Sequence, residues 1–404
     1  MNLAFIGGGA AGFFGSIICA QANPKNKVIL FEKSRQLLTK VRISGGGRCN
    51  VTHSCFDPKI LVQNYPRGSK ALLGPFTKFQ PRDTIQWFES RGVKLKTEAD
   101  GRMFPITDNS STIIDCLTSQ AKISGVEIRT GCGVEAIKMT NAGFILILSD
   151  GNEIPCDKVL VATGSSPKVW DSLKALGHTI VPPVPSLFTF NVPDSPLVEL
   201  AGISVPKANA KVMNTPLEQS GPLLITHWGF SGPAILKLSA WGARILNEKE
   251  YRFTLQVNWL PDKTVEELRN EMLKVKENFP ARLVMNEGPP ELPRNLWKKL
   301  AERAGVTSEM RWSGVSKTLL QAIIQELKSG AFECSGKSTY KDEFVTSGGV
   351  ALGEVDFKTM QSKLCSGLHF AGEVLDIDGV TGGFNFQNAW TTAWIAGGAM
   401  GGEA

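Results

Sequence analysis

The sequence predicts an α/β fold in which a Rossmann-like domain is interrupted by a small β domain and a helical region. Three observations predict this fold. A strand, a glycine turn, a helix and a second strand follow one another within the first 32 residues. A proline cluster at 182–185 ends that pattern, and short strand-like segments follow it. Glycine-rich strand and helix patterns return from about residue 341, so the two ends of the chain are expected to complete one domain.

The composition is that of an ordinary globular protein with more than one core. The chain has 404 residues, of which 42% are hydrophobic and 20% charged, and this length usually divides into two or three domains. The net charge of +6 predicts a mildly basic enzyme and leaves open a site for phosphates or nucleic acid. No run of five lysines or arginines marks a nucleic-acid tail.

Cysteine usage and hydropathy point to an intracellular compartment. The eight cysteines are scattered and form no C-x-x-C pair, so we expect neither a zinc site nor a disulfide framework. The N-terminus enters a strand at once, and no apolar run reaches about 18 residues. We therefore expect a cytoplasmic protein with no membrane span and no metal site.

The first motif is the glycine turn Gly7-x-Gly9-x-x-Gly12, between a strand at 3–6 and a helix. Gly7 permits the tight turn, Gly9 lets a pyrophosphate approach the backbone, and Gly12 allows close packing of helix and strand. Glu32 ends the second strand, 20 residues after Gly12, where an acid accepts hydrogen bonds from an adenosine ribose. The pattern predicts a bound dinucleotide, although Glu32 could also be an ordinary strand-end carboxylate.

Two further motifs resemble elements of FAD enzymes. An apolar strand from Lys158 ends in Ala162-Thr163-Gly164, which is typical of disulfide-reductase-like folds but also fits a buried strand with a glycine turn. A strand near the C-terminus ends in Gly372-Glu373, and 378–387 then leads into a helix. In such enzymes the acid lies near the ribityl–pyrophosphate, and the helix directs its N-terminus at the flavin. Three elements in this order predict FAD, in a discontinuous domain.

The fourth motif is the glycine-rich loop at 43–52. Ser44, Arg48 and Asn50 supply hydrogen-bond donors for a phosphate or the edge of a flavin. A flavin-linked redox disulfide would need a partner for Cys49, and the next cysteine is Cys55. We therefore favour a packing or flavin-contacting thiol over a redox-active one.

Together these motifs closely resemble the YhiN/BaiN-like flavoprotein family over essentially the whole chain. The most specific parts of the resemblance are 44–52, 346–350 and 370–390, and 227–234 resembles the family's barrel motif. The chain departs from the family at Ser165-Ser166 and at 185–187, and the second departure leaves substrate identity open. The resemblance implies an FAD-binding domain at 1–185 and 341–404, a β-barrel insert at 186–259 and 330–340, and a helical insert at 260–329.

The motifs and the resemblance give one set of expected site residues. The expected catalytic residues are Arg48, Cys49, Asn50 and His227, with His227 as a proton donor or, alternatively, a structural histidine beside Trp228. The expected cofactor-binding residues are Gly7, Gly9, Ala11, Gly12, Glu32, Lys33, Ser44, Gly46, Arg48, Cys49, Asn50, Val134, Thr163, Gly164, Gly372, Glu373, Gly383, Phe384 and Asn385.

The resemblance implies an FAD-dependent oxidoreductase. We expect a reductase that passes a hydride from flavin N5 to an activated C=C bond. A second complete G-x-G-x-x-G is absent, so NAD(P)H is expected as a transient co-substrate and electron donor. The alternatives are an rRNA uridine reductase that makes dihydrouridine, an amine oxidase, and a non-enzymatic flavin-binding redox module. Small-molecule and RNA substrates, and the oligomeric state, stay open.

Overall fold

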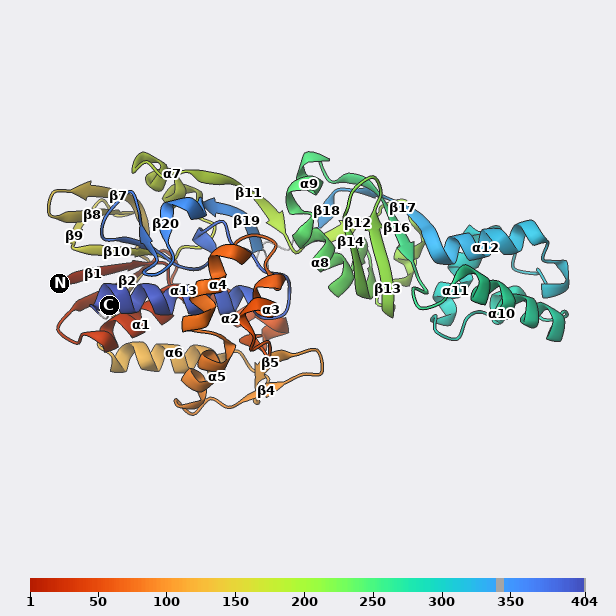
Figure 1. The fold of residues 1–404 in the computed structure, drawn as a ribbon, viewed down its shortest axis with the longest axis horizontal. Helices are drawn as coiled ribbons and strands as arrows, with labels where there is room; N and C mark the ends of the chain where they lie inside the picture. The colour runs from red at the N-terminus through yellow and green to blue at the C-terminus, as the bar shows by residue number, and fades with distance from the viewer. Residues whose placement is uncertain (339–344, 403–404) are drawn as a thin grey trace. The chain divides into compact units, whose positions relative to one another are not determined.

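A computed structural model describes residues 1–338 and 345–402 of the chain. The chain divides into two compact units (Figure 1). Unit 1 combines Met1–Pro185 with Lys341–Ala404, and unit 2 is Ser186–Tyr340. The first division falls at the end of the proline cluster, whereas the expected boundary at 340/341 lies outside the described residues. Within the described ranges, no helix has both the length and the apolar character needed to cross a membrane.

Unit 1 is built on a seven-stranded sheet with the order β20-β21-β22-β10-β1-β2-β6. Neighbouring strands are parallel from β22 to β6, and the two strands at the other edge are antiparallel. The inner strands are almost wholly buried because other elements of unit 1 pack against them, among them helix α1 (Ala10–Ala22) and strands β8 (Gly143–Leu148) and β9 (Glu153–Cys156). The strands are β1 (Asn2–Ile6), β2 (Lys27–Glu32), β6 (Glu127–Thr130), β10 (Lys158–Val161), β20 (Val355–Asp356), β21 (Gln361–Ser362) and β22 (Leu368–Phe370).

Helices α1 (Ala10–Ala22) and α13 (Phe384–Gly401) lie side by side in the core of unit 1 (Figure 1). Glycines permit this close contact. A Cβ atom at Gly397 would lie 2.5 Å from the carbonyl oxygen of Gly15, and one at Gly401 would lie 2.9 Å from that of Cys19. The backbones of the two helices are therefore in direct contact. Because α1 lies near the N-terminus and α13 near the C-terminus, this contact joins the two ends of the chain.

The other elements of unit 1 surround this core. Two further three-stranded sheets have the orders β3-β5-β4 and β7-β8-β9, and β11 pairs with β19. Their bounds, with those of the helices, are α2 (Thr39–Gly47), β3 (Thr52–His53), α3 (Pro58–Leu61), η1 (Val62–Asn64), α4 (Ser69–Lys78), α5 (Pro81–Glu89), β4 (Leu95–Thr97), β5 (Arg102–Pro105), α6 (Ser111–Ile123), β7 (Val134–Thr140), β8 (Gly143–Leu148), β9 (Glu153–Cys156), α7 (Pro167–Ala175), β11 (Ile180–Ser186), β19 (Val345–Val350), η5 (Leu352–Glu354) and η6 (Gly372–Val374).

The proline cluster does not interrupt regular structure, although the sequence pattern suggested a break there. Residues 182–185 lie inside β11, which pairs with β19 in a two-stranded sheet within the described part of the chain. Proline has no backbone N–H to donate, but an edge strand in such a pair needs donors on one side only.

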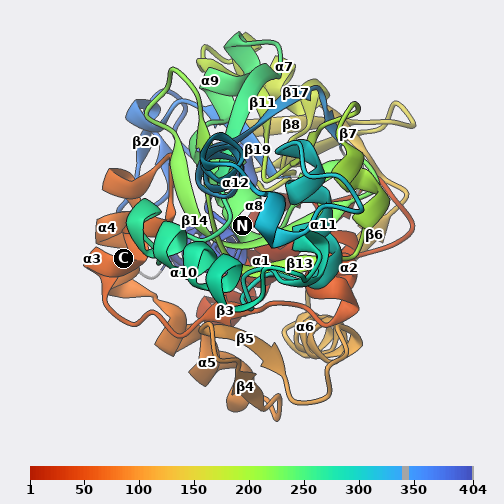
Figure 2. The same ribbon diagram turned by 90° about the vertical axis from the view of Figure 1, so that its right-hand side faces the viewer.

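Unit 2 contains a seven-stranded antiparallel sheet with the order β17-β16-β13-β14-β15-β12-β18 and three helices after residue 264. One hydrophobic core runs through the sheet and these helices, and it includes Phe230, Trp259, Trp297 and Leu327. Figure 2 shows α10, α11 and α12 grouped together. The bounds are β12 (Thr189–Asn191), η2 (Pro196–Leu200), β13 (Ser204–Val212), β14 (Glu218–Thr226), β15 (Gly229–Ser231), α8 (Pro233–Trp241), α9 (Ala243–Glu248), β16 (Arg252–Asn258), α10 (Val265–Asn278), η3 (Val284–Asn286), α11 (Arg294–Arg303), η4 (Trp312–Gly314), α12 (Lys317–Ser329), β17 (Gly330–Ser335) and β18 (Lys337–Ser338).

Candidate functional site

The candidate site lies at the carboxyl edge of the parallel sheet in unit 1. β22, β10, β1 and β2 are neighbours and run parallel, so their carboxyl ends meet at one edge. Three predicted motifs follow these strands: the glycine turn after β1, Thr163-Gly164 after β10 and Gly372-Glu373 after β22. Glu32 ends β2 at the same edge. Ligands of open α/β sheets bind at this position.

The three glycines of the first turn serve different purposes. A Cβ atom at Gly7 would lie 2.5 Å from the Ala162 carbonyl oxygen, and one at Gly12 would lie 1.8 Å from the Gly7 carbonyl oxygen. Packing of the protein itself therefore requires both. Gly9 is different, because a Cβ atom there would have no atom of the described residues within 4 Å, apart from those of its chain neighbours Gly8 and Ala10. Gly9 caps the N-terminus of α1, and the open space beside it fits a pyrophosphate at a positive helix end.

The Glu32 carboxylate is fixed beside this turn. Its Oε2 accepts a hydrogen bond from Gly8 N–H (2.7 Å), and its Oε1 accepts one from Ser34 N–H (2.8 Å). A carboxylate accepts about four hydrogen bonds, so ribose hydroxyls can still donate to it. Cys132 N–H donates to the Glu32 carbonyl oxygen (2.9 Å), which places the start of β7, with the predicted Val134, beside the end of β2. Lys33 is exposed at the same place.

Glu373 joins the second and third motifs. A Cβ atom at Gly164 would lie 3.7 Å from Glu373 Oε2, and Glu373 Oε1 accepts from Ser165 Oγ (3.2 Å) and from Thr346 N–H (3.0 Å). Lys40, which the sequence analysis missed, donates to Glu373 Oε2 at 2.6 Å.

The two ends of the chain also meet at Gly372. A Cβ atom there would lie 3.1 Å from the Cβ of Ala11, the second residue of α1. Gly372 N–H donates to Thr392 Oγ1 of α13 (2.9 Å). After the neighbouring strand β10, the Thr163 hydroxyl donates to the Gly164 carbonyl (3.3 Å). The predicted residues Ala11, Thr163 and Gly372 therefore belong to one edge of the sheet.

The glycine-rich loop begins where α2 leaves helical geometry at Ser44 (ψ 147°). Gly45, Gly46 and Gly47 follow with φ values of +58°, +69° and +82°, which side chains disfavour. A Cβ atom at Gly46 would have nothing within 4 Å, so this loop also presents open backbone. Cys49 N–H closes the loop by donating to the Ser44 carbonyl oxygen (3.0 Å).

Asn50 connects this loop to the N-terminus of α13. In the amide orientation that satisfies both neighbours, Asn50 accepts from Gly383 N–H (2.9 Å) and donates to the Thr52 carbonyl (3.1 Å). Gly383 is the N-cap of α13, and a Cβ atom there would lie 2.5 Å from the Thr52 carbonyl oxygen. Two predicted motifs more than 300 residues apart in the sequence therefore meet in space.

Residues before α13 and in the segment before α4 also hydrogen-bond to the start of α13. Asn385 exchanges two hydrogen bonds with the backbone of Gly379 (2.8 and 2.9 Å). Tyr65 donates its hydroxyl hydrogen to the Phe384 carbonyl (2.6 Å). Phe384 and Asn385 are among the predicted site residues, whereas no motif in the sequence indicates Tyr65.

A buried polar network supports the same region. Thr52 and Gln387 end two of the predicted motifs, but nothing in the sequence predicted that they meet. Gln387 Oε1 accepts from the hydroxyls of Thr52 (2.6 Å) and Thr84 (2.9 Å). Gln387 Nε2 donates to Thr391 Oγ1 (3.0 Å). All four side chains are buried, so these hydrogen bonds fix the loop against α13 in a low-dielectric setting.

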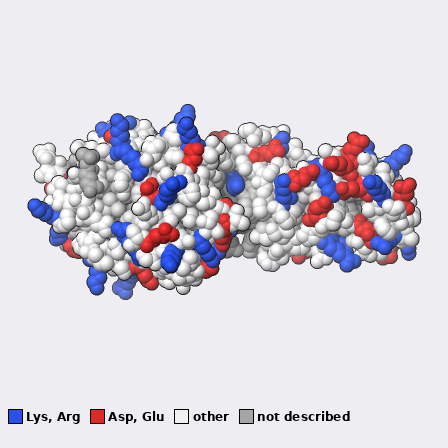
Figure 3. Space-filling model, turned by 60° about the horizontal axis from the view of Figure 1, so that its bottom comes forward, with Lys and Arg blue, Asp and Glu red and all other residues white. Residues whose placement is uncertain are grey.

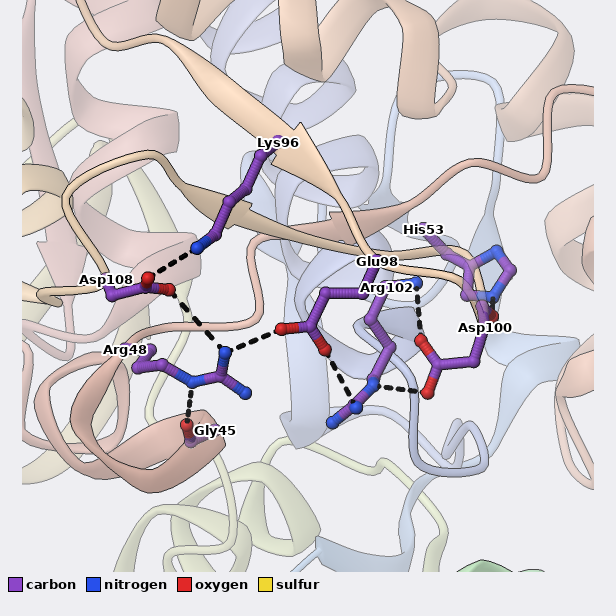
Figure 4. A network of polar contacts seen from close by, with 8 residues as sticks. All are labelled: Gly45, Arg48, His53, Lys96, Glu98, Asp100, Arg102 and Asp108. Atoms are coloured by element: carbon purple, nitrogen blue, oxygen red, sulfur yellow. Dashed lines mark hydrogen bonds and ion pairs between the residues drawn. The ribbon is translucent and has the colours of Figure 1, made fainter.

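Arg48 is the centre of a charged network on the β4–β5 hairpin (Figure 4). Its Nη1 contacts Glu98 Oε1 at 2.6 Å and Asp108 Oδ1 at 3.5 Å, and its guanidinium lies 4.0 Å from the ring centroid of Phe104. Glu98 also accepts from Arg102 Nη2 (2.9 Å). The hydrogen bond to Glu98 raises the pKa of Arg48. The predicted Arg48 is therefore held as a fixed cation by acids that sequence reasoning did not find.

Cys49 has the properties of a packing thiol. It is fully buried, and burial raises its pKa to about 12, so the thiol is protonated at neutral pH. All eight cysteines are free, including Cys55. These observations favour the packing or flavin-contacting interpretation over thiolate chemistry.

The histidines occupy contrasting positions. The predicted His227 is exposed in the turn between β14 and β15 of unit 2, next to the exposed Trp228. His53, which was not predicted, stacks on Phe384 with ring centroids 4.7 Å apart, and its Nε2 lies 3.1 Å from the Asp100 carbonyl oxygen. His178 and His369 are buried in unit 1. Within residues 1–338 and 345–402, no three His, Cys, Asp or Glu side chains are grouped so that they could hold a metal ion.

A Rossmann sheet with glycine motifs along its carboxyl edge, together with the comparisons that follow, places the protein among the FAD-dependent oxidoreductases. The model of the HI0933-like protein Rossmann domain matches residues 1–399. The chain therefore belongs to the HI0933-like family, which confirms the resemblance inferred from the sequence.

Relatives of known name match the chain over nearly its full length. A 3-dehydro-bile acid delta(4,6)-reductase from Clostridium scindens is 28% identical over 407 residues, covering 98% of this chain and 98% of that protein. A ribosomal RNA dihydrouridine synthase from Escherichia coli is 30% identical over 401 residues, covering 96% and 95%. A Haemophilus influenzae protein of the same name is 28% identical.

Two solved structures share the fold at low sequence identity. The open conformation of a flavocytochrome c3 fumarate reductase matches with a TM-score of 0.51 and 17% identity, covering 99% of this chain and 78% of that one. A 3-ketosteroid-delta4-(5alpha)-dehydrogenase from Rhodococcus jostii matches with a TM-score of 0.51 and 12% identity, covering 99% and 96%.

Proposed function

We propose that this protein reduces a carbon–carbon double bond that is conjugated to a carbonyl group. The observation that carries the proposal is that two full-length relatives are named for this type of chemistry. One is a delta(4,6)-reductase of a 3-dehydro bile acid, and the other makes dihydrouridine, whose parent base carries a C=C bond next to a carbonyl group. The substrates differ, but the reacting group is of the same kind.

The residues at the carboxyl edge fit FAD. The open space beside Gly9 at the N-terminus of α1 would take the pyrophosphate, and Glu32 would accept hydrogen bonds from the adenosine ribose. The loop from Ser44 to Asn50 and the N-terminus of α13 would border the flavin. When bound, FAD supplies a hydride at N5 to an activated double bond, and we propose NAD(P)H as the electron donor.

The protein's own groups would stabilise charge and supply a proton. The N-terminus of α13 carries partial positive charge that favours an anion beside it. Arg48 contributes a permanent cation close to the same loop. Reduction of a conjugated C=C bond also needs a proton, for which we propose His227, since histidine exchanges protons near neutral pH.

We also propose that the sheet of unit 2 closes into a barrel. β17 and β18 stand at opposite ends of the sheet order, yet only Gly336 separates them in the sequence. A single residue spans only about 3.5 Å of extended chain, so the two sheet edges have to approach each other at this point.

We further propose a cytoplasmic location for the reductase, because NAD(P)H and ribosomal RNA are both available there.

A turnover experiment under anaerobic conditions tests the reductase function. Purified protein that contains FAD is mixed with NADH or NADPH and then with a cyclic enone such as 4-androstene-3,17-dione. We expect NAD(P)H to bleach the flavin absorbance, the enone to restore it, and mass spectrometry to find a product two mass units heavier than the enone. Bleaching without reoxidation by enones or by uridine-containing RNA would indicate a non-enzymatic redox module. Reduction of the flavin by amines instead would indicate an amine oxidase.

A second candidate, reduction of uridine in ribosomal RNA, is favoured by the 30% identity to the Escherichia coli synthase over 96% of this chain. The test uses unmodified ribosomal RNA transcribed in vitro, NADPH and the purified protein. After digestion to nucleosides, mass spectrometry should detect dihydrouridine. If enones are reduced and no dihydrouridine forms, the substrate is a small molecule.

A further inference from the structure

The positive charge of this chain is concentrated in one segment. Residues 58–82 contain five basic residues and no acidic residue, so they carry +5 of the total net charge of +6. The rest of the chain is close to neutral. Figure 3 shows acidic and basic side chains interspersed on the face that it draws. The 58–82 segment therefore differs from the ordinary surface of the molecule.

The segment forms a surface from three helices of unit 1. α3 contacts α4, and Figures 1 and 2 both show these helices side by side. Arg82, near the start of α5, lies with its guanidinium 5.3 Å from the ring centroid of Phe56, just before α3. Four basic side chains are exposed on this surface, which we call the basic surface: Lys59, Lys70, Lys78 and Arg82.

These four cations form no ion pair within the described residues, although two carboxylates, Asp57 and Asp83, flank the segment in the sequence. In the described parts of the chain, no carboxylate lies within 4.0 Å of any of them. The fifth basic residue, Arg67, is instead paired with the buried Asp378. Unpaired cations raise the local positive potential, which attracts polyanions.

Apolar groups lie among these cations. Phe56 (38% exposed), Ile60 (53%) and Leu73 (39%) are partly uncovered on the same helices or beside them. An exposed aromatic ring beside an arginine offers a platform on which nucleotide bases stack. Lys70 and Lys78 are eight residues apart on α4, or about 12 Å of helix axis, so one small phosphate cannot contact both. An extended polyanion can.

The basic surface directly adjoins the candidate site. α4 and α5 pack against α13. The turn that precedes α4 is joined to the loop that leads into α13, because Val380 N–H donates to the Asn64 carbonyl (2.9 Å) and Tyr65 donates to the Phe384 carbonyl (2.6 Å). A polymer bound on α3–α5 would therefore lie next to the helix N-terminus that we assign to the flavin.

We propose that the basic surface binds the phosphodiester backbone of a structured RNA whose uridine is reduced. This inference rests on the second candidate function above. Lys59, Lys70, Lys78 and Arg82 would neutralise phosphates, and Phe56 would stack on an unpaired base. Lysine and arginine contacts to phosphates fix the position of the RNA without reading its sequence, so the choice of the uridine is made elsewhere in the site.

The test compares two quadruple variants of the full-length protein that carry the same charge change. One is Lys59→Gln, Lys70→Gln, Lys78→Gln, Arg82→Gln. The control is Lys25→Gln, Lys94→Gln, Lys122→Gln, Lys138→Gln, which removes four exposed lysines of unit 1 that also have no carboxylate within 4.0 Å in the described residues. Bound FAD and the turnover of 4-androstene-3,17-dione report whether each variant keeps its fold and its reducing site.

Binding of in vitro transcribed ribosomal RNA is measured as a function of salt. We expect the variant of the basic surface to bind at least tenfold more weakly at low salt and to lose about 3 from the slope of log K against log salt, since each lost phosphate contact removes roughly 0.7–0.9. The control should bind like the wild type. Both variants should retain FAD and reduce the enone at the wild-type rate.

Other results would overturn the proposal. Equal weakening in both variants would mean that only net charge matters, and unchanged binding would place the RNA elsewhere. If the wild type binds vesicles with anionic headgroups but not RNA, the surface contacts a membrane. Because binding is measured without turnover, RNA binding without dihydrouridine formation would overturn the rRNA reductase function and leave the binding surface in place.

Discussion

At the scale of single residues, the structure separates glycines that serve the protein from those that serve a ligand. Gly7 and Gly12 touch backbone atoms of the protein, whereas the space beside Gly9 is open. The sequence pattern already assigned Gly9 to the pyrophosphate, and Gly7 and Gly12 to the turn and to helix packing. The packing around each glycine fits that division.

Gly9→Val should abolish FAD retention without unfolding the protein. The backbone at Gly9 has φ −90° and ψ −170°, which valine adopts easily, and its side chain would meet no protein atom within 4 Å of the Cβ. The matched control is Gly12→Val, whose Cβ would lie 1.8 Å from the Gly7 carbonyl oxygen and should prevent folding. Flavin absorbance and circular dichroism of both variants check this. Stoichiometric FAD in Gly9→Val would show that the pyrophosphate lies elsewhere.

The buried His369 makes stability depend on pH. Burial lowers its pKa from 6.5 to about 4, with a further decrease from Lys158. In the unfolded state His369 takes up a proton near pH 6.5, whereas in the folded state it stays neutral down to about pH 4. The free energy of unfolding is therefore unaffected by His369 above pH 6.5 and decreases as the pH falls from 6.5 towards 4. A shift of this size corresponds to about 3 kcal/mol.

His369→Gln should therefore flatten the decrease in the free energy of unfolding between pH 6.5 and 4. Urea unfolding at a series of pH values measures it. Some slope should persist, because burial also lowers the pKa of His178. A variant with the same slope as the wild type would mean that His369 is protonated in the folded protein.

At the scale of elements, the contact between α1 and α13 joins the two ends of the chain. The backbones approach each other at glycines such as Gly15 and Gly397, and Phe14 of α1 also packs on Trp390 of α13, with ring centroids 5.3 Å apart. Helical periodicity in the sequence does not reveal the partner of either helix. Because α13 also provides the Gly383 N-cap and the Gln387 network, the position of α1 against α13 determines where the candidate flavin site lies.

Neighbouring glycines on α13 should respond in opposite ways to alanine. A Cβ atom at Gly397 would lie 2.5 Å from the Gly15 carbonyl oxygen, so Gly397→Ala should destabilise unit 1 by roughly 1–3 kcal/mol. Gly398 has nothing within 4 Å of the same position, and Gly398→Ala should stabilise the helix by up to about 1 kcal/mol. Chemical unfolding followed by tryptophan fluorescence compares them. Equal effects would contradict the tight contact between α1 and α13.

At the scale of the whole molecule, the residues expected to bind the cofactor and the residue expected to supply the proton lie in different units. The cofactor motifs all lie in unit 1, and the predicted proton donor His227 lies in unit 2. The role of His227 stays a prediction, and kinetics can test it directly.

His227→Gln should leave FAD content and reduction by NAD(P)H unchanged, since this exposed side chain lies outside the unit that contains the glycine motifs. Turnover of the enone should decrease by about 10²-fold or more if the histidine supplies the proton. An unaltered turnover across pH 5–9 would remove His227 from the mechanism and leave the rest of the proposal intact.

The sequence alone determined the parts of this protein that depend on local spacing. The glycine turn, Glu32, Thr163-Gly164 and Gly372-Glu373 could all be found because each follows a strand with a recognisable pattern. Their order also predicted a domain made from both ends of the chain. Local geometry is enough for these inferences, since a tight turn before a helix needs glycine whatever surrounds it.

Only the tertiary structure decided which distant side chains meet. Nothing in the sequence pairs Asn50 with Gly383, Arg48 with Glu98, or Lys40 with Glu373, because these contacts join segments that have no fixed spacing along the chain. Burial, which raises the pKa of Cys49 and lowers that of His369, is likewise a property of the folded core. Long-range packing, and not residue type, therefore set the charge and protonation of this site.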